Sequence, residues 1–149
     1  FVGERGMGWQ QVSSELAYDR SGPERCLSGV CVLAEFVVAA GIEPQPGEAV
    51  LIGRATEHLL ALRRMSISVA GMLEDGKSPE VEAALVKELG NNFEKLVPEI
   101  ARLAAPDAGA SGEFRQAFVD TLLGSPAFTI RGGTREILRG VIARGLGLR

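Results

Sequence analysis

The residues best suited to chemistry lie near the end of the chain, where two glycines and a threonine precede an apolar-periodic run. This stretch is Phe128-Thr-Ile-Arg-Gly-Gly-Thr-Arg-Glu-Ile-Leu-Arg139. Glycine lets the backbone come close to a ligand, and a helix that begins at Thr134 would present unpaired N–H groups and the positive end of its dipole. The pattern therefore suits an anion such as a pyrophosphate, although an ordinary glycine-rich helix start has the same pattern.

The overall composition is that of an ordinary globular domain. With 149 residues, of which 46% are apolar and 23% charged, the chain is large enough for one domain with its own core. A formal net charge of −3 and few aromatic side chains argue against nucleic-acid binding. We find no apolar run that could span a bilayer and no leader pattern, and we expect a cytoplasmic protein. Because the chain begins with Phe1, we also expect it to be a fragment of a longer one.

Metal binding and nucleophilic catalysis have little support. Cys26 and Cys31 are the only cysteines, and five positions apart on a helix they cannot bridge to each other. We expect both to be small core residues in a reducing compartment. The one histidine, His58, has no nucleophile pattern beside it and is predicted to be a surface or packing residue. We expect no metal site.

Helical periodicity runs through the chain without sustained alternation, which predicts an all-α, up-and-down bundle. The predicted helices are about 7–40 with a kink at 21–23, 48–74, 78–104, 113–123, and 134–145. Pro98 is expected to bend the third helix or split off its last turns. The residues predicted to face the core are Leu51, Ala55, Leu59, Leu62, Ser66, Val69 and Leu73; Val81, Leu85, Leu89, Phe93, Leu96, Ile100 and Leu103; and Phe114, Phe118 and Leu122.

Two segments resemble the C-terminal α-helical domain of the acyl-CoA dehydrogenase family. Residues 132–144, Gly-Gly-Thr-Arg-Glu-Ile-Leu-Arg-Gly-Val-Ile-Ala-Arg, resemble the family's closing Gly-Gly-Thr-x-Glu-Ile-x-Arg motif and its Ile-Ala-Arg ending. Gly6-Met-Gly-Trp9, leading to Tyr18-Asp-Arg20, resembles the start of that domain and its Glu-Arg pair. The resemblance implies that residues 1–149 form one helical bundle domain with an extra C-terminal helix, the last third of a longer flavoprotein.

In this family an acyl-CoA thioester loses its α-proton to a carboxylate while the β-hydrogen leaves as hydride to FAD. In most members the base is a glutamate just ahead of the final Gly-Thr, where this chain has Gly132. In a second group the base comes from the first helix, one residue before an arginine. The resemblance therefore implies that Asp19 is the base, with Glu15, one turn earlier on the same face, as the fallback carboxylate.

Further roles follow from the same resemblance. Arg20 is expected to lie near the substrate or to brace the base, and the Gly132 N–H would stabilise the charge that grows on the thioester carbonyl. Gly133, Thr134 and Glu136 match positions that contact FAD, with a ribose hydroxyl as the expected partner of Glu136. The implied partners are an acyl-CoA substrate, an acceptor like electron-transfer flavoprotein, and further subunits in a homo- or hetero-oligomer.

The chain also departs from the family pattern. Asp19 is one methylene shorter than glutamate, and residues 44–48 and 103–112 lack the family's Arg-x-x-Phe-Gly and Gln-x-x-Gly-Gly segments, which reach a neighbouring subunit's flavin. Arg135 and Arg139, four residues apart, are expected on a solvated face. We expect an acyl-CoA dehydrogenase whose isolated domain is inactive and lacks FAD. The alternative is a non-catalytic helical assembly subunit that pairs with an active acyl-CoA dehydrogenase partner.

Overall fold

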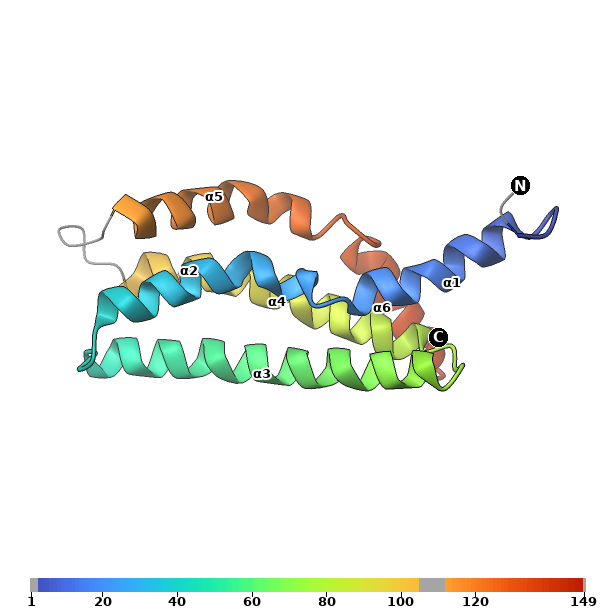
Figure 1. The fold of residues 1–149 in the computed structure, drawn as a ribbon, viewed down its shortest axis with the longest axis horizontal. Coiled ribbons are helices and arrows are strands. Elements are labelled where there is room, and N and C mark those ends of the chain that lie inside the picture. The colour runs from blue at the N-terminus through green and yellow to red at the C-terminus, as the bar shows by residue number, and fades with distance from the viewer. Residues whose placement is uncertain (1–2, 105–111, 149) are drawn as a thin grey trace.

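The computed structural model describes residues 3–104 and 112–148, and within these ranges it contains helices and no strand. The helices are α1 (Gly8–Ser21), α2 (Glu24–Ala40), α3 (Pro46–Glu74), α4 (Glu80–Ala104), α5 (Gly112–Phe128) and α6 (Arg135–Gly145). Figure 1 shows α2, α3, α4 and α5 running along the long axis, with α1 and α6 at one end and the N-terminal part of α1 extending beyond the bundle. The predicted all-α bundle with an extra C-terminal helix is confirmed.

The centre of the bundle is α4, which contacts each of the other five helices. Because it is surrounded, it buries small residues such as Ala83 and Ala84 and larger ones such as Phe93 and Val97. The main core packs α4 against α2, α3 and α5. A second cluster joins α4 to α1 and α3 through Ala17, Val69, Ala83 and Val86.

The first predicted helix, about 7–40, is two helices, so the expectation of one kinked helix is corrected. Gly22 leaves the helical conformation with ψ at 146°, and Pro23 cannot donate a backbone hydrogen bond. A side chain of α3 binds the chain at this break: the Ser66 hydroxyl donates to the Ser21 carbonyl at 2.5 Å. This contact fixes the end of α1 against the bundle.

The fourth predicted helix, expected to end at residue 123, is longer than expected, because α5 continues to Phe128. Pro126 lacks the N–H that would bond the Leu122 carbonyl. The Ser125 hydroxyl donates to that carbonyl at 2.9 Å instead. Pro98 likewise lies inside the unbroken span of α4. The predicted loop at 105–111 lies outside the described residues.

Apolar periodicity predicts the buried face of α3 correctly but that of α4 only in part. Leu89 and Leu103 are 44% and 67% exposed, although both were expected in the core. Lys87, Asn91 and Glu94 are instead completely buried. The spacing of apolar residues does not predict the buried positions of α4, because a central helix has neighbours on most of its sides. The buried residues of α3 are Ala55, Leu62 and Val69.

Three further expectations concern the cysteines, the buried face of α5 and membrane-spanning helices. Cys31 is exposed, which corrects its assignment to the core, and the side chain of Cys26 lies outside the described set. On α5, Leu122 is largely exposed while Thr121 is buried. None of the helices in the described ranges combines the length and apolar character that a membrane crossing requires.

Candidate functional site

The loop before α6 is held by the end of α1. The Arg20 Nε donates to the Gly132 carbonyl at 2.8 Å, across 112 positions of sequence. Arg20 is only 7% exposed, so this contact is shielded from solvent. The structure therefore brings together the two segments that the resemblance singled out.

Both glycines of the loop adopt conformations that other residues rarely take. The φ angles are 66° at Gly132 and 112° at Gly133. A Cβ on Gly133 would lie 3.4 Å from the Arg20 Nη2 and 3.7 Å from the Leu138 Cδ2. Glycine therefore allows both the turn and the close approach of the guanidinium.

The bond from Arg20 also orients the peptide that joins Gly132 to Gly133. No cis peptide is present in the described chain, and in a trans peptide the C=O and N–H point in opposite directions. With its carbonyl directed at Arg20, this peptide directs the Gly133 N–H away from Arg20. The carbonyl of this peptide is thus used for packing, and its N–H lies on the opposite side.

Arg20 lies among carboxylates. Burial lowers the pKa of the Arg20 guanidinium, while the nearby charges of Asp19 and Glu80 raise it; the net direction is downward. An arginine nevertheless stays protonated in proteins. Asp19 is half-buried and Glu15, one turn earlier, is exposed. The pair of residues 19 and 20 thus places a carboxylate and a buried cation at the end of α1.

The start of α6 has the predicted position. Thr134 is the extended residue before the helix, and the Leu138 N–H donates to its carbonyl at 3.0 Å. Leu138 is completely buried and anchors this turn to the bundle. Glu136 is exposed, and hydrogen bonds from its own backbone N–H and from Thr134 hold the pKa of its carboxyl below the ordinary value. The helix start therefore presents an ionised carboxylate to solvent.

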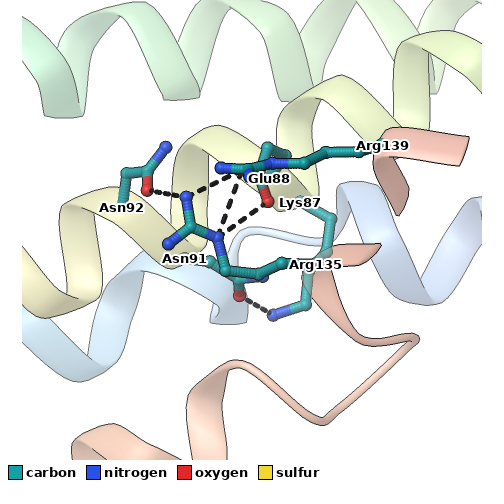
Figure 2. A network of polar contacts seen from close by, with 6 residues as sticks. All are labelled: Lys87, Glu88, Asn91, Asn92, Arg135 and Arg139. Atoms are coloured by element: carbon teal, nitrogen blue, oxygen red, sulfur yellow. Dashed lines mark hydrogen bonds and ion pairs between the residues drawn. The ribbon is translucent and has the colours of Figure 1, made fainter. Parts of the chain in front are cut away.

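Sequence reasoning missed a set of polar side chains on α4, which we call the α4 polar ridge: Lys87, Glu88, Asn91, Asn92 and Glu94. The Lys87 ammonium donates to the Phe128 carbonyl at 2.8 Å. It also donates to the Asn91 side-chain oxygen (Figure 2). The spacing of 87, 91 and 94 follows a helical period, which was the available signal.

Glu88 is the ridge residue that holds α6. Arg135 donates to its carboxylate at 2.9 Å from Nη2, and Arg139 donates at 3.0 Å from Nε (Figure 2). Arg135 also donates to the Asn92 side-chain oxygen at 2.7 Å. Burial would raise the pKa of the Glu88 carboxyl, but the hydrogen bonds from both arginines outweigh it and the pKa lies below its usual value. The expectation of a solvated face is therefore corrected for Arg135, whose side chain is 27% exposed, whereas Arg139 is 63% exposed and also pairs with Glu88.

The same ridge reaches the loop itself. Arg131 lies 3.4 Å from the buried carboxylate of Glu94, and its guanidinium stands 5.0 Å from the centre of the Phe128 ring. The segment from residue 128 to 135 is thus attached to α4 at both ends and in its middle. Together with Arg20, these contacts define the conformation of the loop.

Open space lies along α1. A hollow of about 310 Å³ is bordered by one face of α1, including Ala17 and Tyr18, and by the turn between α3 and α4. His58 is exposed, as predicted. Across the described ranges, no cluster of three His, Cys, Asp or Glu side chains has an arrangement that could hold a metal ion.

Comparison with known proteins identifies the family. Residues 46–147 match the sequence model of the acyl-CoA dehydrogenase C-terminal domain. The fold is similar to a solved variant of the steroid acyl-CoA dehydrogenase Tcur3481-Tcur3483, with a TM-score of 0.73 and 22% identity over 99% of this chain and 42% of that chain. No curated protein sequence matches this chain significantly. The chain belongs to the acyl-CoA dehydrogenase family, of which it contains the C-terminal helical domain.

Proposed function

We propose that this chain is the C-terminal domain of a flavin-dependent acyl-CoA dehydrogenase that introduces an α,β double bond into an acyl-CoA thioester. The observation that carries the proposal is the 2.8 Å hydrogen bond from Arg20 to Gly132. It holds the Asp19–Arg20 pair of α1 against the Gly-Gly-Thr loop. Proton abstraction needs a carboxylate near a donor to the thioester carbonyl, and these segments supply the two groups.

Each residue has a defined part in this proposal. Asp19 takes the α-proton of the thioester, and its neighbour Arg20 supplies a compensating positive charge. The Gly132 N–H donates to the thioester carbonyl and stabilises the negative charge that grows there. Because Asp19 is shorter than glutamate, the substrate lies about an ångström closer to α1 than a glutamate would require.

The loop also fits a flavin nucleotide. Gly133 has no side chain to obstruct a phosphate, and Thr134 leads into the N-terminus of an 11-residue helix, where backbone N–H groups favour anions. The exposed carboxylate of Glu136 suits a ribose hydroxyl. When bound, FAD supplies hydride acceptance from the substrate β-carbon.

Substitution of Asp19 tests the proposal. In the complete polypeptide and its assembly, Asp19→Ala and Asp19→Asn are expected to lower kcat by about 100-fold or more while FAD stays bound. Glu15→Gln, one turn away, is the matched control and should leave kcat near wild type. The assay uses fatty, branched and steroid acyl-CoA thioesters with electron-transfer flavoprotein or a dye as acceptor. Full turnover in both Asp19 variants would contradict the proposal.

A non-catalytic assembly subunit is the second candidate, favoured by the start of α3. There the Gln45 N–H donates to the Glu48 carboxylate at 2.8 Å, which closes a capping box. A carboxylate at this position repels phosphate, and Arg54 lies exposed two turns further on. In this case the chain pairs with an active acyl-CoA dehydrogenase partner, and turnover of the assembly is unchanged by Asp19→Ala.

A further inference from the structure

We propose that the α4 polar ridge positions the Gly-Gly loop for the reaction, with Lys87 and Glu88 as its positioning residues. This inference rests on the proposed function of the loop. Neither residue is assigned to substrate or flavin. Each acts through residues 128–135, which lie between the ridge and Arg20.

The contacts are placed where they limit loop movement. Lys87 holds the last carbonyl of α5 at Phe128, at 2.8 Å, immediately before the loop. Glu88 holds Arg135, the first residue of α6, at 2.9 Å, immediately after it. The loop therefore begins and ends on adjacent residues of one helix. Together with the bond from Arg20 to the Gly132 carbonyl, these two charged contacts anchor the loop on both sides of the Gly132 amide.

The burial of Lys87 also supports a positioning role. A completely buried ammonium loses its hydration, and an apolar side chain of similar volume would often be as stable. The neighbouring buried residues of the same helix include the apolar Ala83 and Val86 and the polar Asn91. Lys87 donates to the Asn91 side-chain oxygen and to the Phe128 carbonyl, so a lysine here ties the ridge to the end of α5, where the loop begins.

The test measures amide hydrogen exchange and kinetics in the complete polypeptide and its assembly. Lys87→Met and Glu88→Gln keep side-chain size but remove the charge. Peptides covering residues 128–138 are expected to exchange about ten-fold faster, since a lost charged hydrogen bond favours local opening by that order. We expect kcat to fall more than KM rises, because the substrate still binds while the amide is misplaced.

Two controls make the result specific. Arg102→Gln removes an exposed ion pair with Glu99 at 3.0 Å on the same helix and should alter neither measurement. Arg135→Gln combined with Glu88→Gln should have less effect than the sum of the two single changes, because the bond between these two residues is lost in either one. The bonds from Arg139 to Glu88 and from Arg135 to Asn92 are each lost in only one of them.

Two outcomes would overturn the inference. One is unchanged exchange at 128–138 in both ridge variants. The other is faster exchange spread evenly over all helices together with a lower unfolding midpoint. The exchange result stands even if the wild type has no acyl-CoA dehydrogenase activity, so failure of the proposed function is seen separately.

Discussion

Gly132 and Gly133 let the loop turn beside Arg20. A guanidinium donates only along defined directions, so its partner has to sit at the right distance and angle. Both glycines have positive φ angles, which residues with a side chain rarely adopt, and the Gly132 carbonyl accepts the bond from Arg20. The backbone conformation of the loop therefore favours glycine at these two positions, even before any ligand is considered.

Gly133→Ala is expected to destabilise the fold by about 1–2 kcal/mol, since it forces a Cβ into a left-handed conformation. The new methyl would lie 3.4 Å from Arg20 Nη2, an ordinary van der Waals contact, so the cost comes from the backbone conformation. Gly140→Ala, within α6, is the matched control: a Cβ there meets nothing within 4 Å, and alanine favours helix by about 0.5–1 kcal/mol. Denaturant unfolding measures both, and equal effects of the two changes would refute the argument.

Glu88 makes stability depend on pH in a defined direction. Because the pKa of its carboxyl is below the ordinary value in the folded state, the folded chain binds fewer protons than the unfolded chain in the acidic range. Its contribution is present above the ordinary glutamate pKa, about 4.3, and is lost as pH falls through the lower folded value. The difference in unfolding midpoint between wild type and Glu88→Gln should therefore shrink between pH 7 and about pH 3.5. A constant difference would be inconsistent with this assignment.

Among the elements, the helices with one exposed face were predictable from sequence and the central helix was not. On α3 a single apolar stripe faces the bundle, so Leu62 and Val69 could be assigned to the core from spacing alone. On α4 neighbours on several sides bury residues of every kind. Burial of Lys87 depends on a carbonyl 41 positions away, and no local pattern reports such a partner.

The candidate site shows the same limit. The Gly-Gly-Thr motif and the start of α6 follow from residue types whose backbone preferences are local. The contact between Arg20 and Gly132 was not derivable from spacing, because it depends on how the chain turns at Gly22, between α1 and α2. Arg135 was misjudged for a related reason: its i,i+4 spacing from Arg139 is the same whether it faces water or a carboxylate.

The break between α1 and α2 makes a prediction at this scale. Ser66→Ala removes the hydroxyl that donates to the buried Ser21 carbonyl, which should cost about 1–2 kcal/mol and loosen the end of α1 that bears Arg20. Ser68→Ala, at an exposed position of the same helix, should change stability by less than about 0.5 kcal/mol. Unfolding midpoints and amide exchange of residues 17–23 measure the difference. Identical behaviour of the two variants would show that the break is not held from α3.

At the scale of the whole molecule, the length of this chain compared with that of the solved protein it resembles matters more than any single contact. The chain spans 42% of the length of the solved structure it resembles. The N-terminal part of α1 extends beyond the bundle (Figure 1). On this helix Trp9, in the first turn, is 85% exposed and Tyr18, in the last turn, is 60% exposed. Nine positions apart, they lie on opposite sides of the helix, so α1 is exposed on more than one face.

This arrangement predicts that the 149-residue chain alone does not retain FAD. The proposed flavin contacts, Gly133, Thr134 and Glu136, lie within four consecutive positions and cover only a small part of so large a ligand. A few hydrogen bonds at one exposed helix start offset little of the cost of immobilising it. After incubation with FAD and gel filtration, we expect a helical circular-dichroism spectrum and no flavin absorbance, whereas the complete assembly treated identically should elute yellow. Stoichiometric flavin on the isolated chain would mean that these helices form the whole binding site. A complete assembly with one flavin per copy of this chain would in turn exclude the purely structural subunit, because each copy would then be part of an occupied site.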